Sequence, residues 1–152
     1  MPNFASDSVS PKLSLLTLLC GAGLLLISGC GGGSSDAHPV TGKVHNGADL
    51  LKVANAEIGV GKVEVIFYRV NDAGKADESD PMSAIADPAT GEFSPGGPAG
   101  DGLPAGTYKV AVRQWDPYPS VDQLKGKFDA AHTPIELVVD GTKTIDIDLS
   151  QY

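Results

Sequence analysis

The most regular stretch of the chain reads GKVEVIFYRV, at residues 61–70. Apolar residues recur there at every second position, so that Val63, Val65 and Phe67 share one face of an extended chain. Alternation of this kind predicts a strand with a buried side, and no comparable helical periodicity occurs after it. The sequence therefore predicts an all-β fold in which this stretch is a core strand.

Shorter stretches on both sides alternate in the same way and predict six further strands. They cover residues 40–45, 82–87, 92–94, 107–113, 135–139 and 144–149. Turn residues at 88–91 and at 140–141 predict that the strands flanking each turn pair as a hairpin. Seven short strands joined by turns are typical of a two-sheet antiparallel β-sandwich.

The segments between these strands are rich in glycine and proline, of which the chain has 19 and 11. Residues 71–81, 95–106 and 115–134 show no apolar period and are predicted to be loops. The net charge of −8 argues against nucleic acid as a partner, because an acidic surface repels a phosphate backbone. We therefore expect one acidic domain of short strands and long loops.

An uncharged apolar run, LSLLTLLCGAGLLLI, occupies residues 13–27. It follows Lys12 and precedes two small residues, which is the organisation of a secretory signal peptide. The alternative is a transmembrane helix, which needs about 20 apolar residues to cross a bilayer. The shorter run favours a helical signal peptide over residues 1–29.

The end of this run resembles the lipobox of bacterial lipoproteins. The resemblance rests on five consecutive residues, Leu26, Ile27, Ser28, Gly29 and Cys30. It implies that a diacylglycerol is attached to Cys30 and that a lipoprotein signal peptidase, recognising the four residues before it, cleaves between Gly29 and Cys30. The protein is then expected in the cell envelope, anchored by this lipid to a membrane, with the choice between inner and outer membrane left open.

Cleavage at that point has two consequences for the mature chain. Residues 30–37, rich in glycine and serine, become a flexible lipidated tether. The other cysteine, Cys20, is lost with the signal peptide, so no disulfide can form within the domain. Packing and sheet hydrogen bonds alone must hold the domain together.

Three motifs beyond the tether resemble small planctomycete lipoproteins with a carboxypeptidase-regulatory-like, transthyretin-like domain. They read VTGKV at residues 40–44, DPATGEF at 87–93 and LPAGTYKV at 103–110, the second with one residue more than the D-x-x-G-x-F of that family. The resemblance implies a transthyretin-like or immunoglobulin-like sandwich over residues 38–152. The motifs are turn and core signatures, and they imply neither a catalytic activity nor a cofactor.

Patterns typical of a catalytic or metal site do not stand out. The three histidines lack the spacing of a metal site, and the motif of a serine nucleophile is missing. Acidic residues in the loop at 71–81 are weak candidates for binding calcium, the alternative being a solvated loop. These candidates are Asp72, Asp77, Glu78 and Asp80.

One loop, WDPYP at residues 115–119, has the composition of a recognition site. Its aromatic residues, Trp115 and Tyr118, are candidates to contact a ligand, because proline stiffens the loop and aromatic rings stack on sugars or side chains. The alternative is that Trp115 caps the sandwich. We expect a non-catalytic interaction or structural module that contacts envelope proteins or a surface polymer. The alternative function is a carbohydrate- or calcium-binding accessory domain.

Overall fold

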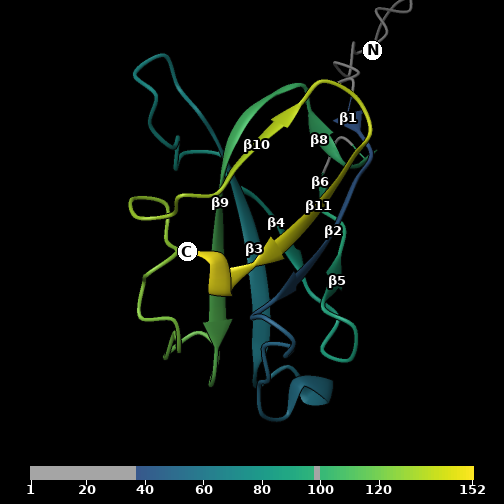
Figure 1. Cartoon of the computed structure of the whole chain (residues 1–152), viewed down its shortest axis with the longest axis vertical. Coiled ribbons are helices and arrows are strands. Elements are labelled where there is room, and N and C mark those ends of the chain that lie inside the picture. The colour runs from purple at the N-terminus through teal and green to yellow at the C-terminus, as the bar shows by residue number, and fades with distance from the viewer. Residues whose placement is uncertain (1–36, 98–99) are drawn as a thin grey trace, which may run out of the picture. The chain divides into compact units, whose positions relative to one another are not determined.

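The computed structural model describes residues 37–97 and 100–152 (Figure 1). The predicted signal peptide, its lipobox and Cys30 lie outside the described residues. All of the described residues belong to one compact unit, Gly32–Tyr152. No helix among them is long and apolar enough to span a membrane. Their only helices are two short 3-10 turns, η1 (Ala56–Ile58) and η2 (Leu149–Gln151), which confirms the all-β prediction.

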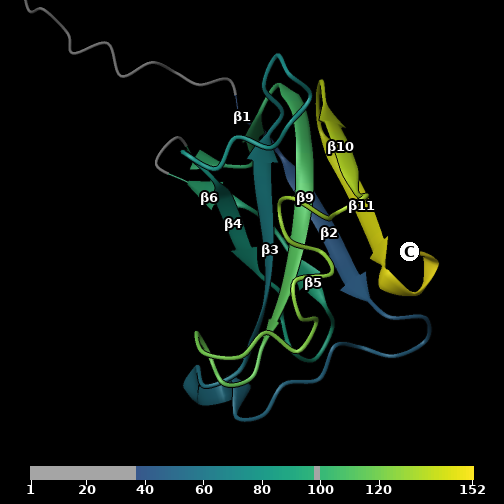
Figure 2. The same ribbon diagram turned by 90° about the vertical axis from the view of Figure 1, so that its left-hand side faces the viewer.

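The larger sheet has four antiparallel strands in the order β10-β9-β3-β4. These strands are β3 (Lys62–Arg69), β4 (Met82–Ile85), β9 (Gly106–Trp115) and β10 (Glu136–Val139). The strand predicted at residues 61–70 is β3, and it pairs along its whole length with β9 at the centre of the sheet (Figure 2). Strand β9 also extends the stretch predicted at 107–113 by a residue or two at each end.

The second sheet has three strands in the order β11-β2-β5. They are β2 (Val40–His45), β5 (Glu92–Phe93) and β11 (Lys143–Asp148). Two short ladders accompany the sheets, one of β1 (Ala37–His38) with β8 (Leu103–Pro104) and one of β6 (Gly96–Gly97) with β7 (Gly100–Asp101). Ala37, which the sequence assigns to the tether, is thus already part of a strand.

Both predicted hairpins are wrong in their pairing. Strand β4 pairs with β3 and strand β5 with β2, so the chain crosses from one sheet to the other between them. The turn itself forms, because the Asp87 carboxylate accepts hydrogen bonds from the backbone N–H groups of Ala89 and Thr90. The turn residues fix the reversal, but they do not dictate that the flanking strands remain partners, and the buried Ala86 directs the chain into the core instead.

The C-terminal pair behaves in the same way. Strand β10 pairs with β9, whereas β11 joins the other sheet and runs parallel to β2, which corrects the expectation of a wholly antiparallel arrangement. The alternation in β11 places Ile145 and Ile147 on one face, and this pattern is satisfied equally well by a parallel or an antiparallel neighbour.

Side chains from both sheets pack into one apolar core. Val63, Val65 and Phe67 of β3 are at most 4% exposed, as their alternation predicts, and the Phe67 ring lies 6.2 Å from that of Phe93 in the other sheet. The opposite face of β3 is also covered, because Ile66 and Tyr68 are buried in a second, smaller cluster. Strand β3 is therefore buried on both faces.

The long loop predicted at 115–134 has no strand after Trp115, as expected, but it is not detached from the sheet. It runs along the part of the β9 edge that β10 does not reach: the Val112 N–H donates to the carbonyl of Phe128 at 3.0 Å, and the Gln123 N–H donates to that of Gln114 at 2.8 Å. Phe128 itself is 2% exposed and belongs to the main core.

Candidate functional site

Two loops meet at the end of the domain that is opposite β1. In Figures 1 and 2, η1 lies at one end of the molecule and β1, where the described chain begins, at the other. The loop containing η1 contacts the loop after β9, because the Tyr118 N–H donates to the Val60 carbonyl at 2.7 Å and the Ala54 N–H donates to an Asp116 carboxylate oxygen at 3.1 Å. We call the surface formed by residues 50–61 and 115–121 the loop end.

The predicted aromatic pair lies at this loop end. The Trp115 ring meets the Tyr118 ring edge to face, with centroids 5.9 Å apart, and its Nε1 donates to Glu64 Oε2 at 2.9 Å. The Lys62 Nζ, 3.3 Å from Glu64 Oε1, lies 3.7 Å from the centroid of the Tyr118 ring. Tyr118 remains 46% exposed. The pair is thus held in place by charged neighbours while Tyr118 still faces solvent.

Trp115 is not part of the core between the two sheets. Val112 of β9 points into the main core, and Trp115, three residues further along the strand, lies on the opposite face. On that outer face the guanidinium of Arg113 lies 5.2 Å from the Trp115 ring. Trp115 therefore belongs to a charged, aromatic cluster on the outside of the larger sheet.

A small apolar cavity of about 150 Å³ opens beside this cluster. Its wall consists mainly of aliphatic residues from the loop at 50–63 and from the segment that joins β4 to β5, among them Leu50, Val53, Ala56, Ile85 and Pro88. Two charged residues also line it. The Lys62 ammonium is paired with Glu64, and the Asp87 carboxylate accepts hydrogen bonds within its own turn. The cavity therefore presents hydrocarbon to a ligand.

A larger, open groove of about 930 Å³ shares part of this wall. The four residues common to the cavity and the groove, Ile85, Ala86, Asp87 and Pro88, form the crossing between the two sheets. Among the other residues that line the groove, Lys43, Glu92 and Asp146 are charged.

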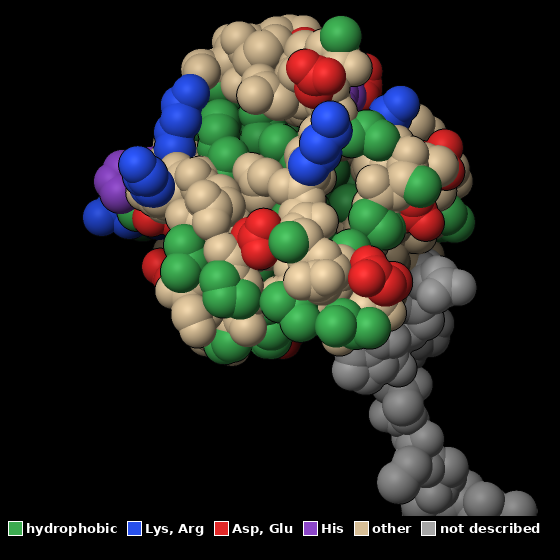
Figure 3. All heavy atoms as spheres, turned by 90° about the horizontal axis from the view of Figure 1, so that it is seen from below, with side chains coloured by type: hydrophobic (Ala, Val, Ile, Leu, Met, Phe, Trp, Pro, Cys, Tyr) green, Lys and Arg blue, Asp and Glu red, His purple; other side chains and the backbone are tan. Residues whose placement is uncertain are grey.

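Several large apolar side chains are exposed at or near the loop end. Ile58 is 72% exposed and Val121 is 44% exposed, and Ile85, at the crossing, is 61% exposed. Figure 3, which views the molecule from below, shows hydrophobic side chains spread over this end between separate acidic and basic groups. Apolar groups that a fold leaves in water at one end are typical of a contact surface.

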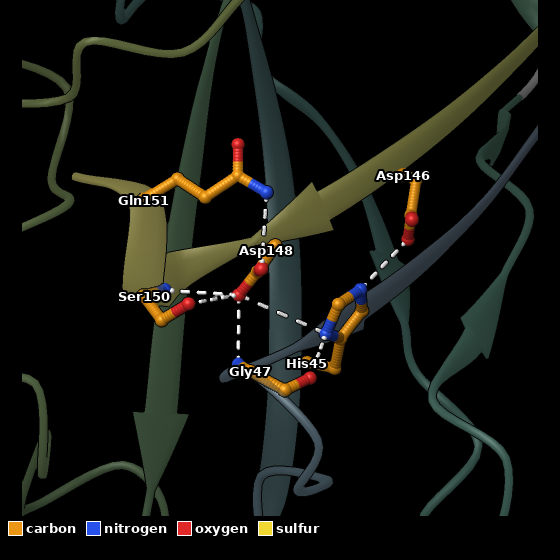
Figure 4. A network of polar contacts seen from close by, with 6 residues as sticks. All are labelled: His45, Gly47, Asp146, Asp148, Ser150 and Gln151. Carbon is orange, nitrogen blue, oxygen red and sulfur yellow. Dashed lines mark hydrogen bonds and ion pairs between the residues drawn. The ribbon is translucent and has the colours of Figure 1, made fainter.

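A second polar cluster, absent from the sequence-based predictions, joins β2 to β11 (Figure 4). The Nδ1 of His45 lies 2.7 Å from the Gly47 carbonyl oxygen, and its Nε2 lies 2.9 Å from Asp146 Oδ1. Both partners are acceptors, so the ring is best satisfied when both nitrogens carry a proton. The Gly47 carbonyl is the main cause that raises the pKa of His45 above its ordinary value, and Asp146 adds to it.

Asp148 completes this cluster. Its carboxylate accepts hydrogen bonds from the Gly47 N–H at 2.7 Å, from the Ser150 N–H and hydroxyl at 3.0 and 2.8 Å, and from the Gln151 amide at 3.1 Å. These donors hold the pKa of Asp148 far below its ordinary value. The cluster ties the turn after β2 to the C-terminal 3-10 helix. The signal in the sequence was the pair of aspartates at 146 and 148, which alternation places on one face of β11.

The acidic candidates for calcium do not converge. Asp72, Asp77, Glu78 and Asp80 are all exposed, and Asp77 accepts both of its hydrogen bonds from Ser79 next to it, which lowers the pKa of Asp77. Within residues 37–97 and 100–152 no group of three or more histidine, cysteine or acidic side chains is placed to hold a metal ion.

The predicted lipidation site, Cys30, and the peptidase recognition residues Leu26, Ile27, Ser28 and Gly29 lie outside the described residues. No protein-family model, curated protein or solved structure matches the chain.

Proposed function

We propose that this chain is a lipid-anchored protein of the cell envelope whose domain is a non-catalytic interaction module, a transthyretin-like β-sandwich that presents its loop end to another envelope protein or a surface polymer. The anchor is the lipid on Cys30. The sandwich is supported by the four-stranded and three-stranded sheets that share one core.

The observation that carries this proposal is that β1 and the loop end lie at opposite ends of the domain. The described chain begins at Ala37 in β1, and three of the six large apolar residues that are exposed lie on loops at the opposite end, namely Ile58, Tyr118 and Val121 (Figures 1 and 2). The seven steps from Cys30 to Ala37 can span at most about 25 Å when fully extended. Attachment at β1 leaves the loop end, at the other end of the domain, free to face away from the membrane.

The absence of catalysis in this proposal is supported by how the polar side chains are used. His45 and Asp148 are both engaged in hydrogen bonds that join β2, β11 and η2. His132 is bound through its Nδ1 to Asp129, three residues away, at 2.8 Å. These contacts stabilise turns and strand ends.

The carbohydrate-binding alternative retains one supporting observation, the exposed ring of Tyr118 beside Trp115. The calcium-binding alternative has none among the described residues, because the acidic side chains of the loop at 71–81 point to solvent or to their own turn.

Mass spectrometry of the membrane fraction tests the anchor. A diacylglycerol on Cys30 and an N-terminus at that residue are expected, and Cys30→Ala should abolish both. An unmodified Cys30 or an intact leader contradicts the anchor.

Site-specific photo-cross-linking in intact cells tests the loop end. A photoreactive residue at position 118 should give discrete adducts, whereas one at Val138, which is 55% exposed on β10, should give none. Equal labelling at both positions contradicts the choice of surface. Quenching of Trp115 fluorescence by glycans, with no protein adduct at position 118, favours the alternative function. Turnover of an envelope substrate by the domain contradicts the non-catalytic assignment.

A further inference from the structure

We infer that the cavity and the adjoining groove together bind an extended, basic segment of a partner protein, with one apolar side chain of that segment seated in the cavity. This inference rests on the proposed function, since it identifies the chemistry of the partner. Three independent features of the described residues determine the chemistry: the size of the cavity, the free edge of strand β4 beside it and the charge of the groove.

The cavity determines which side chain of the partner segment is buried. A volume of about 150 Å³ equals that of an apolar cavity that stays dry and binds benzene, so a single aromatic or branched aliphatic group fills it. Of the two charged residues that line it, Lys62 is paired with Glu64 and Asp87 accepts hydrogen bonds within its own turn, so the wall of the cavity is mainly hydrocarbon. The exposed Ile85 at the shared wall extends the apolar contact beyond the cavity.

The free edge of strand β4 determines the conformation of the bound segment. Strand β4 is the last strand of its sheet, and Ile85 at its end lies on the wall that the cavity and groove share. An edge strand offers unpaired backbone N–H and C=O groups, which an extended peptide can use to add a strand. Strand β5 is also an edge strand, but the backbone N–H and C=O of Glu92 are already bonded to Thr90 and Asp87. A segment that pairs with β4 reaches the shared wall at Ile85 and can place one side chain in the cavity.

The groove determines the charge of the bound segment. It is lined by three carboxylates, those of Asp87, Glu92 and Asp146, and by one ammonium group, that of Lys43; Asp146 is also bonded to His45. Hydrogen bonds from the Ala89 and Thr90 N–H groups lower the pKa of Asp87, so this side chain stays ionised near neutral pH. The chain as a whole carries −8, in the same direction. Lysine or arginine residues on both sides of the buried apolar side chain complement this groove.

Short labelled peptides test the inference on the full chain purified in detergent. The probes are Lys-Lys-Phe-Lys-Lys, Lys-Lys-Ala-Lys-Lys and Glu-Glu-Phe-Glu-Glu, and binding is followed by fluorescence anisotropy. The basic phenylalanine peptide should bind about tenfold or more tightly than the alanine peptide, since burial of a phenyl ring is worth about 1.5–3 kcal/mol, and tenfold corresponds to 1.4 kcal/mol. The acidic peptide should bind weakest.

Two variants locate the binding. Ala56→Leu places added carbons in the cavity and should remove the preference for phenylalanine, whereas Ala131→Leu, on an exposed loop elsewhere, should leave it unchanged. Glu92→Gln should weaken the basic peptides about two- to fivefold at low salt, and Asp72→Asn, which removes the same charge outside the groove, should have a smaller effect. Urea unfolding followed by Trp115 fluorescence shows that each variant is folded.

Equal affinity for the three peptides overturns the inference without reference to any variant, and so does an unchanged phenylalanine preference in folded Ala56→Leu. Saturable binding of a glycan in place of every peptide also overturns it. These results are distinct from a failure of the proposed function, because lipidation of Cys30 and cross-linking at position 118 are measured separately and need no peptide in the groove.

Discussion

Phe128 gives the sharpest test of the core, because it is a buried anchor within a loop. Its side chain is 2% exposed, its backbone carbonyl accepts a hydrogen bond from the Val112 N–H, and its ring meets that of Tyr152 edge to face at 6.4 Å. Replacing it by alanine removes a fully buried ring from the core without altering a strand. The Phe128→Ala variant should therefore destabilise the domain strongly.

The size of this effect follows from two contributions. Loss of the buried ring costs about 3 kcal/mol in transfer free energy. If about half of the roughly 100 Å³ left behind stays empty, the cavity adds about 1 kcal/mol at about 24 cal/mol per Å³. Tyr152 is 49% exposed at the chain terminus and can move partly into the space, which reduces the second contribution. We expect a loss of about 3–4 kcal/mol in the free energy of unfolding.

Urea unfolding followed by the fluorescence of Trp115, the single tryptophan, measures this loss. The matched control is Val121→Ala in the same loop, where the side chain is 44% exposed and the expected change is below about 0.5 kcal/mol. A loss of less than about 1 kcal/mol for Phe128→Ala, at an unchanged urea dependence, would refute the reasoning that this loop belongs to the core.

Three further predictions concern hydrogen bonds. The pKa of His45 is raised above 6.5 in the folded protein, so protonated His45 stabilises the fold below that pH, and this contribution is lost as the pH rises through the folded pKa. His45→Gln should therefore lower the melting temperature more at about pH 5.5 than at about pH 8.5. An equal loss at both pH values contradicts the role of protonation. Asp122 accepts hydrogen bonds from the backbone N–H groups of Gln114, Leu124 and Gly126. Asp122→Ala should therefore cost about 2–3 kcal/mol in urea unfolding, and Asp122→Asn, which keeps one acceptor oxygen, about half of that. No loss in Asp122→Ala would show that the acceptor oxygens contribute nothing. Tyr108→Phe removes the 2.8 Å hydrogen bond to the Pro104 carbonyl and should cost about 1 kcal/mol by the same assay; no measurable loss would mean that water replaces the hydroxyl.

The strands were predictable where one face had to be buried. Residues 61–70 alternate so regularly that the position of β3 and its core-facing side chains follow from the sequence alone. Pairing was not predictable in the same way, because β5 and β11 each leave a well-formed turn and join a sheet other than that of the preceding strand. Periodicity records which face of a strand is buried, but it does not record the neighbour.

The candidate site was likewise predictable only in part. The sequence predicted the aromatic pair Trp115 and Tyr118 from composition, but the hydrogen bond from Trp115 to Glu64 depends on the register between β9 and β3. The cavity lay beyond prediction, because segments far apart in the chain line it. The buried position of Phe128 was missed because the surrounding segment lacks an apolar period.

The loop that follows β9 has a consequence for neighbouring copies of the protein. Proteins anchored by lipid share a two-dimensional surface, where local concentrations are high and an open sheet edge would let one copy pair with the next. From Val110 to Gln114 the edge of β9 is occupied by backbone groups of the loop, at Ile135, Phe128 and Gln123. An irregular segment saturates this edge without offering a new row of backbone groups in its place. It ends the sheet there and protects the central strand from pairing with another copy, a protection that the proposed lipid anchor would make more important.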